Sequence, residues 1–182
     1  MTTLNEPADV VLKRGKQPPA EIIRLLVFHV ADCAYALPVT DVSEIISLAE
    51  VTRPPVCPPF LRGFVNISGT PLPVISVRGL FDLSEVPCGR YSPLLLLRAD
   101  KRRLALLVDR VSRIVAVSTG SVAPLSADHS LNNCVTGILR LEGSNVLLLS
   151  AARILLEEEH ASLAALEEAE QGRLRSLEAA TP

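Results

Sequence analysis

The sequence predicts a mainly β protein that is built as two small barrels and followed by a long C-terminal helix. The composition is 48% apolar but only 3% aromatic, so the core must be built from Val, Leu and Ile, which suit pleated strands. Two blocks of sequence occur twice in the same order, which predicts two similar lobes. From Ala151 onward the chain is rich in Ala, Leu and Glu, which are strong helix formers.

The repeated blocks indicate an internal duplication. Residues 25–46 align without a gap with residues 94–115, and residues 63–81 align with residues 137–155. The offset changes from 69 to 74 residues between the blocks, so the second copy gains five residues in a longer loop at 121–133. Two similar lobes imply a groove between them and a pair of unlike faces. Eight positions of the first block meet identical residues: Leu25, Leu26, Ala36, Leu37, Val39, Val42, Ser43 and Ile45.

Short apolar runs separated by tight polar turns predict the strands of each lobe. Residues 1–20 are polar and contain three prolines, so they are interpreted as a flexible arm. Residues 40–47 are expected to be extended or to form a short helical turn, and residues 100–102 form a charged hairpin tip. The expected strands cover residues 22–30, 35–39, 63–67, 72–77, 93–99, 104–108, 111–117, 137–141 and 146–149.

The segment at residues 53–59, RPPVCPP, cannot form a regular strand or a helix interior, because proline fixes its own backbone and restricts the residue before it. Its PxxP pattern is also that of a ligand for an SH3 domain. The position between two expected strands favours a rigid internal connection.

Leucines recur every eleven residues in the C-terminal segment, at Leu155, Leu166 and Leu177 and again at Leu163 and Leu174. Eleven residues are close to three helical turns, so these leucines lie on one nearly straight stripe. Two interpretations stay open for the part beyond residue 160. The helix packs along its own barrel, or it pairs with a second chain in a homo-oligomer.

Composition and motifs argue against several classes of function. The net charge of −2 and the absence of Trp argue against a nucleic-acid surface. The four cysteines are scattered singly, which predicts inert thiols. His29, expected to point outward from its strand, and the two other histidines have no ligand partners at metal-binding spacing. No motif of catalysis or cofactor binding occurs, so we expect no enzyme, no metal and no cofactor. No apolar run reaches signal-peptide or membrane-spanning length, so we expect a cytoplasmic protein without direct membrane insertion.

Short motifs follow one another in a fixed order over residues 22–158. They are YALPV at 35–39, VSEII at 42–46, VTRPP at 51–55, PPFLRG at 58–63, FVNISG at 64–69, LPVI at 72–75, LLVDRV at 106–111, GIL at 137–139 and VLLL at 146–149. This ordered series resembles the CheW family of chemotaxis adaptors. The resemblance implies two five-stranded SH3-like barrels related by a pseudo-twofold axis. It also implies a non-catalytic scaffold, whose barrel ends pair with a histidine kinase regulatory domain and whose groove takes a chemoreceptor tip.

The resemblance also carries a set of expected partner-binding residues. Val42 and Glu44 match positions of the family's partner surface; the alternative is that Val42 is core and Glu44 merely solvated. Gly63 and Gly69 match motif glycines whose role can be backbone geometry alone, a strand start and a turn with positive φ that Asn66 caps. The full expected set is Val42, Glu44, Ile46, Arg62, Gly63, Asn66, Ser68, Gly69, Asp109 and Arg110.

Two serines depart from the family's pattern. Ser68 stands where the family usually has an arginine tied to receptor coupling, and Ser76 stands where it usually has an aspartate. We hypothesise that both replace one interacting Arg–Asp pair, so that receptor coupling is weakened or re-specified. Arg62 or Arg78 would then supply the missing charge. Elsewhere, Glu44 aligns with Arg113, and this charge reversal predicts that the two faces prefer different partners.

The sequence therefore predicts an arm at residues 1–20, a CheW-like domain of two intertwined lobes at 21–158 and a helical extension at 159–182. The expected function is a cytoplasmic adaptor that couples chemoreceptor tips to a CheA-type histidine kinase at membrane-associated receptor arrays. The alternative is a stand-alone docking module, which uses the C-terminal helix to oligomerise or to bind a partner outside chemotaxis.

Overall fold

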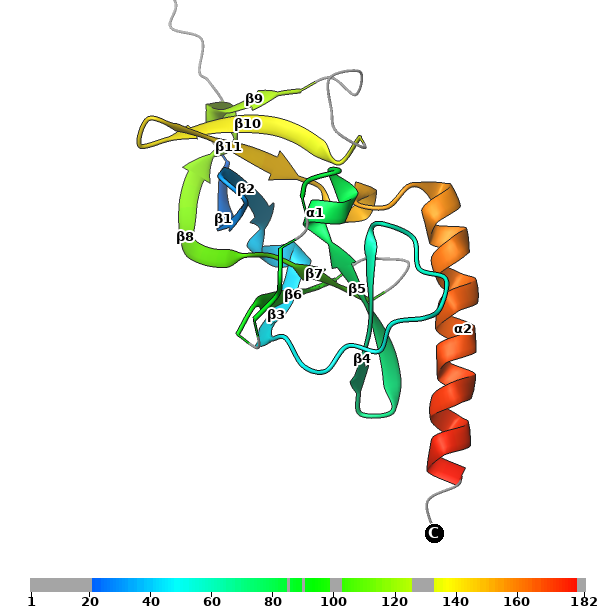
Figure 1. Ribbon diagram of the computed structural model, residues 1–182. Coiled ribbons are helices and arrows are strands. Elements are labelled where there is room, and N and C mark those ends of the chain that lie inside the picture. Colours follow the sequence, from blue (N-terminus) through cyan, green and yellow to red (C-terminus); the bar gives the residue numbers. More distant parts are fainter. Residues whose placement is uncertain (1–20, 85, 90, 99–102, 126–132, 180–182) are drawn as a thin grey trace, which may run out of the picture.

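The computed structural model describes residues 21–84, 86–89, 91–98, 103–125 and 133–179. The expected arm at 1–20, the charged tip at 100–102 and most of the loop at 121–133 lie outside these residues. Within the described chain, strands form two sheets and a long helix follows them (Figure 1). This confirms the mainly β fold with a C-terminal helix.

Each sheet forms one lobe. The six-stranded lobe contains, in order across the sheet, β8 (Arg110–Ser118), β1 (Ile22–Val30), β2 (Cys33–Pro38), β11 (Ser144–Leu149), β10 (Val135–Leu141) and β9 (Val122–Pro124). The five-stranded lobe contains β3 (Val42–Ser47), β6 (Pro93–Leu97), β7 (Leu104–Leu107), β5 (Thr70–Ser76) and β4 (Leu61–Ile67). Short helical turns join the strands at Val39–Asp41, α1 (Val77–Leu80), Thr119–Ser121 and Ala151–Arg153.

The two lobes do not coincide with the two sequence copies. The β1–β2 hairpin of the first copy inserts between β8 and β11 of the second, and the β6–β7 hairpin of the second inserts between β3 and β5 of the first. Backbone pairing shows the equivalence residue by residue. Ala36 pairs with Leu148 in one lobe, and the aligned residues Ala105 and Val74 pair in the other. This exchange makes the lobes interdependent and places the pseudo-twofold axis between them.

Strand β9 differs from the sequence prediction. Residues 122–124 were expected to belong to a loop, but they pair antiparallel with β10, where Ala123 lies opposite Ile138. This pairing adds a sixth strand to one lobe, whereas five strands were expected in each of the two barrels. The short sequence around Val122 carries no alternating pattern of apolar and polar residues that would have revealed it.

The core has three parts that follow the same symmetry. The cluster inside the six-stranded lobe consists of Leu25, Val27, Ala36, Leu139 and Val146. The aligned residues Leu94, Leu96, Ala105, Val65 and Leu72 all belong to the cluster inside the five-stranded lobe. The largest cluster lies between the lobes and includes Leu26, Phe28 and their counterparts Leu95 and Leu97. Both faces are buried over residues 25–28 of β1 and residues 94–97 of β6, so these two stretches are continuous apolar runs.

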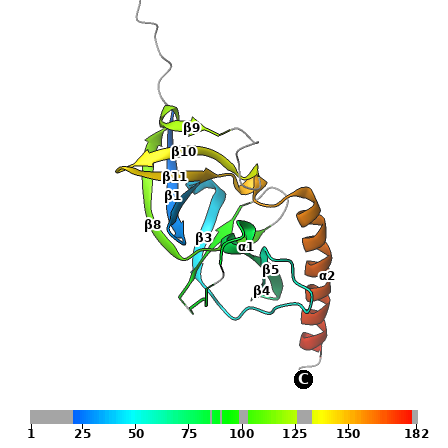
Figure 2. The same ribbon diagram turned by 45° about the horizontal axis from the view of Figure 1, so that its top comes forward.

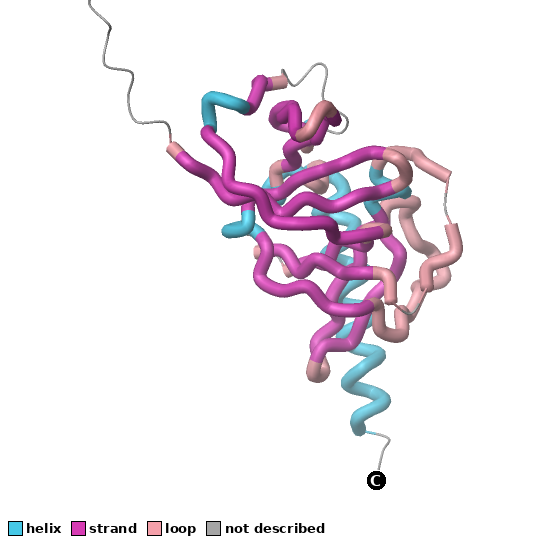
Figure 3. The backbone as a smooth tube through the Cα atoms, turned by 90° about the vertical axis from the view of Figure 1, so that its left-hand side faces the viewer, coloured by secondary structure: helices cyan, strands magenta, loops and turns pink. Residues whose placement is uncertain are grey.

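Helix α2 (Glu157–Ala179) runs along the outside of the five-stranded lobe, against β5 (Figures 1 and 3). Leu163 is fully buried, Leu166 packs against the main core and Leu174 is 9% exposed, whereas Leu177 is 53% exposed. The leucine stripe therefore packs mainly on its own domain. None of the described helices is both long enough and apolar enough to cross a membrane.

Candidate docking groove between the lobes

An apolar groove lies where the lobes meet, between β3 and β8. Both strands are labelled in Figure 2. Its volume is about 170 Å³, and it is lined by Leu26, Val39, Val42, Ser43, Glu44, Ile45 and Ile114. Ile45 is 46% exposed and Ile114 is 49% exposed. The two isoleucines occupy aligned positions of the repeat, so the groove straddles the pseudo-twofold axis. Exposed apolar side chains that gather from two elements mark surfaces for protein binding.

Two equivalent β-bulges bring these isoleucines to the surface. The pairing of β3 with β6 skips Ser43, and the pairing of β8 with β1 skips the aligned Ser112. An extra residue bends its strand and re-aims the side chains beyond it. The Ser43 hydroxyl donates to the Leu96 carbonyl at 3.0 Å. Ile46 packs against the interior cluster of the five-stranded lobe, so it supports the groove from behind and does not line it.

Charge differs between the two sides of the groove. Glu44 lines the groove and is exposed. Its counterpart Arg113 forms an ion pair with Glu142 of the β10–β11 turn, with Nη2 and Oε2 at 2.8 Å. The predicted charge reversal is therefore present in space, but Glu142 partly balances the positive side. The β3 side of the groove is therefore acidic, and the positive charge of Arg113 on the β8 side is partly balanced by Glu142.

The predicted residues of the β4–β5 hairpin do not line the groove, and they lie at two separate ends. Gly63 lies near the end of the hairpin that is opposite its turn. Its φ is +142°, and an added Cβ would come within 2.5 Å of the Thr52 carbonyl oxygen. Ser68 and Gly69 form the turn of the hairpin and have φ of 52° and 82°. The Gly69 N–H donates to Asn66 Oδ1 at 2.8 Å. The predicted capped turn with positive φ is thus confirmed.

The hypothesis that Ser68 and Ser76 replace one interacting pair is wrong. Ser68 lies in the closed turn, whereas Ser76 is the last residue of β5, at the other end of the hairpin. Ser76 is 2% exposed, and its hydroxyl accepts the Gly79 N–H at 3.1 Å as the N-cap of α1. Arg62 also lies far from the turn, and Arg78 forms an ion pair with Asp109, so neither places its charge beside Ser68.

Asp109 links the two lobes. Its carboxylate accepts a hydrogen bond from the Ala31 N–H of the β1–β2 turn at 2.7 Å. It also accepts hydrogen bonds from Nε and Nη2 of Arg78 in α1, at 3.1 and 2.5 Å. Burial alone would raise the pKa of Asp109, but the hydrogen bonds from Arg78 and Ala31 outweigh it and hold that pKa below the usual range. The carboxylate is therefore tied into the fold while 34% of the side chain stays exposed, and its role in partner binding stays a prediction.

Arg110 follows at the start of β8, where it is exposed and lies opposite His29 of β1. His29 was expected to point outward, but it is half-buried, and its Nδ1 atom is buried without a hydrogen-bond partner. Burial, followed by the charge of Arg110, lowers the pKa of His29. Its position in the same alternation as Leu25 and Val27 explains the inward direction.

Of the ten predicted residues, only Val42 and Glu44 line the groove. The prediction missed Ile45 and Ile114, which supply its exposed apolar surface. A signal for both was present, because they form one of the eight identical pairs of the repeat. An apolar residue that is identical in both copies is usually core, and only the bulges reveal that this pair is not.

Comparison with known proteins gives a consistent result. The CheW-like domain family matches residues 24–159. The chemotaxis protein CheW of Helicobacter pylori is 26% identical over 139 residues, which cover 76% of this chain and 84% of that protein. CheW of Treponema pallidum is 24% identical over 152 residues, which cover 80% of this chain and 89% of that protein. The crystal structure of the scaffolding protein TtCheW from Thermoanaerobacter tengcongensis superposes with a TM-score of 0.68 at 21% identity and covers 78% of this chain and 91% of that one.

The fold and the groove together define a two-lobed SH3-like domain with an exposed apolar groove between its lobes. This chain belongs to the CheW-like domain family, as the match over residues 24–159 shows. The curated relatives are chemotaxis proteins named CheW, and the family as a whole consists of non-catalytic adaptors.

Proposed function

We propose that the protein is an adaptor that couples chemoreceptors to a CheA-type histidine kinase in chemosensory signalling. The groove between β3 and β8 supports this most directly. Its two half-exposed isoleucines give an apolar floor, and Ser43 and Glu44 give a polar rim. An amphipathic helix binds such a surface by laying its apolar face into the groove. The helical tip of a chemoreceptor is a partner of this kind.

The kinase's regulatory domain would bind elsewhere, at the end of a lobe. An adaptor must hold two partners at once, so the two surfaces must not overlap. The hairpin ends at β4–β5 and β10–β11 are built from residues that do not line the groove. Binding at a hairpin end would leave the groove open for the receptor.

The cytoplasmic side of membrane-associated receptor arrays is the location that these partners imply. The adaptor would be held there by its contact with the receptor. A fluorescent fusion should therefore form clusters in cells that contain the receptor and should become diffuse when the receptor gene is deleted. Clusters that persist without the receptor would contradict this placement.

The stand-alone module that oligomerises through its C-terminal helix is not favoured. Leu163, Leu166 and Leu174 pack on the protein's own lobe, which leaves Leu177 as the one exposed member of the leucine stripe. A coiled-coil seam needs a sustained row of apolar residues.

The decisive experiment measures both partners on one chain. The receptor tip and the kinase's regulatory domain are titrated separately and together, by calorimetry, into the wild type and two variants. Ile45→Glu should weaken binding of the receptor tip by at least about tenfold, because truncated or charged hot-spot residues cost 2 kcal/mol or more. Binding of the kinase domain should not change. Val56→Glu is the matched control, since Val56 is 80% exposed in the proline segment and outside the groove. Failure of both partners to bind the wild type would contradict the adaptor proposal.

A further inference from the structure

The two hairpin ends related by the pseudo-twofold differ in how they are covered. The β10–β11 end is open: residues 142–145 are exposed, and a Cβ added to Gly143 would meet nothing within 4 Å. At the β4–β5 end, Gly69 is half-buried and Pro71 is buried, although the aligned Gly143 and Asn145 are exposed. Equivalent backbone therefore has unequal exposure.

Helix α2 is what covers the β4–β5 end. The Gln171 side chain donates through Nε2 to the Gly69 carbonyl at 3.1 Å, and Arg173 reaches the Thr52 hydroxyl at 3.4 Å. Leu174 is 9% exposed. The six-stranded lobe carries no such helix among the described residues. The difference between the two ends thus comes from residues 164–179, which follow the last residue that is fully buried in the main core, Leu163.

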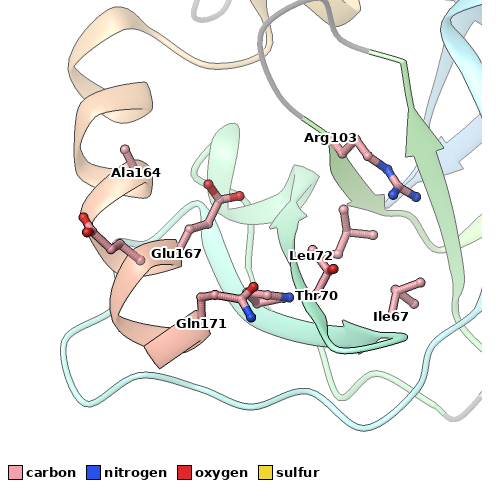
Figure 4. Close-up of a pocket in the computed structure, with 9 residues that line it drawn as sticks. Ile67, Thr70, Leu72, Arg103, Ala164, Glu167 and Gln171 are labelled. Carbon is pink, nitrogen blue, oxygen red and sulfur yellow. The ribbon is translucent and has the colours of Figure 1, made fainter. Parts of the chain in front are cut away.

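This half of the helix does not pack continuously on the lobe, although Glu170 and Leu174 are buried. Between it and the strands lies a cavity of about 440 Å³, lined by Ile67, Thr70, Pro71, Leu72, Arg103, Ala164, Glu167, Glu168 and Gln171 (Figure 4). Glu167 and Gln171 extend from α2 toward the strands, and the apolar side chains of Ile67 and Leu72 lie opposite them (Figure 4). An apolar surface with a gap above it loses the close contacts that hold a well-packed helix. Gly172 weakens the helix at the same place.

We propose that residues 164–179 form a displaceable strap over a second docking surface, the β4–β5 end of the five-stranded lobe. With the strap closed, the adaptor offers the kinase's regulatory domain only the open β10–β11 end. Release of the strap exposes Ile67, Leu72 and the backbone of Gly69, and a second kinase-type domain can then dock there. This inference rests on the proposed function, because it names the regulation of the surfaces that bind the kinase. The strap makes two otherwise equivalent ends unequal.

Two changes of opposite sign test the strap in the full-length chain. Gln171→Ala combined with Leu174→Ala removes the contacts to the lobe and keeps good helix formers. Gly172→Ala strengthens the helix, and its new Cβ meets nothing within 4 Å. A detached segment of this length is at the limit of what stays helical in water, so a stronger helix should favour the closed strap. Arg175→Ala, on an exposed residue of the same helix, is the control.

The readout is the apparent affinity for the kinase's regulatory domain, together with hydrogen exchange of the amides at 66–72. Apparent affinity scales with the fraction of open molecules. The double variant should bind at the β4–β5 end at least about tenfold more tightly. Gly172→Ala should bind there about fivefold more weakly, and Arg175→Ala should match the wild type.

Equal affinity and equal exchange in all four proteins would overturn the strap. If the double variant loses its cooperative unfolding transition, Gly172→Ala decides alone, and an unchanged affinity at the β4–β5 end rejects the proposal. Failure of the wild type to bind the kinase domain at either end is a different result. It would reject the kinase half of the proposed function, and the strap's role with it.

Discussion

Replacing Asp109 with asparagine should destabilise the fold far more than its position at the surface suggests. The change keeps the size of the side chain and removes its charge. Three hydrogen bonds reach the carboxylate, one from Ala31 and two from Arg78. They join the β1–β2 turn of one lobe to α1, which follows β5 of the other lobe.

The magnitude follows from the number of bonds and from their exposure. A hydrogen bond to a charged group contributes about 1.5–3 kcal/mol. The side chains of Arg78 and Asp109 are 14% and 34% exposed, so water compensates part of the loss, and asparagine keeps one oxygen that can accept the Ala31 N–H. We expect a loss of about 2 kcal/mol in the free energy of unfolding. For a chain of this size, that loss corresponds to a fall in Tm of about 4–8 °C.

Urea titration followed by circular dichroism measures this change as a lower midpoint at an unchanged slope. Glu142→Gln is the control, since it breaks the Arg113–Glu142 pair, whose side chains are 47% and 74% exposed. Such an exposed pair contributes about 0–1 kcal/mol. A double-mutant cycle with Arg78→Gln isolates the pair itself. If Asp109→Asn falls within about 0.5 kcal/mol of the wild type, Asp109 does not fasten the lobes, and the reasoning is refuted.

Three further outcomes are expected. Gly63→Ala should lose about 3 kcal/mol or more of stability, because its Cβ would lie 2.5 Å from the Thr52 oxygen at a φ of +142°; a Tm within two degrees of the wild type would contradict this. Stability should fall as the pH drops below the usual histidine pKa of 6.5, because His29 has a lowered pKa in the folded chain and the unfolded chain takes up the proton first. His29→Gln should flatten the dependence of the free energy of unfolding on pH between pH 7 and 5. An unchanged slope in that range would contradict the assignment of this effect to His29. Ser68→Arg should leave the Tm unchanged within about 2 °C, since Ser68 is exposed in its turn, and a larger change by calorimetry would show an unrecognised contact.

Much of the fold could be predicted because two blocks of the sequence each occur twice. The apolar runs at 25–28 and 94–97 are continuous because both faces of β1 and β6 are buried there. The resemblance implied intertwined lobes, but neither copy by itself shows which hairpin crosses into which lobe. The exchange of hairpins depends on parallel pairing of β2 with β11 and of β5 with β7, between residues far apart in the chain.

The groove was only half predicted, for a physical reason. Val42 and Glu44 belong to a recognisable motif, whereas Ile45 has the alternation of a core residue. The bulge at Ser43 changes that alternation, and no residue type marks a bulge of this kind. The expected Ser68–Ser76 pair failed because aligned motifs carry no information about which end of a hairpin a residue occupies.

The central claim is that a chemoreceptor tip binds the groove between β3 and β8. Methyl NMR tests it without any mutation, because Ile45 and Ile114 carry reporters at the groove while Ile75 and Ile154 are buried in the core. The chain is labelled at the isoleucine δ1 methyls and titrated with the receptor tip. The account predicts that the signals of Ile45 and Ile114 shift together and saturate at one equivalent, while those of Ile75 and Ile154 stay in place. Shifts confined to Ile67 or Ile22, with Ile45 and Ile114 unmoved, would contradict it.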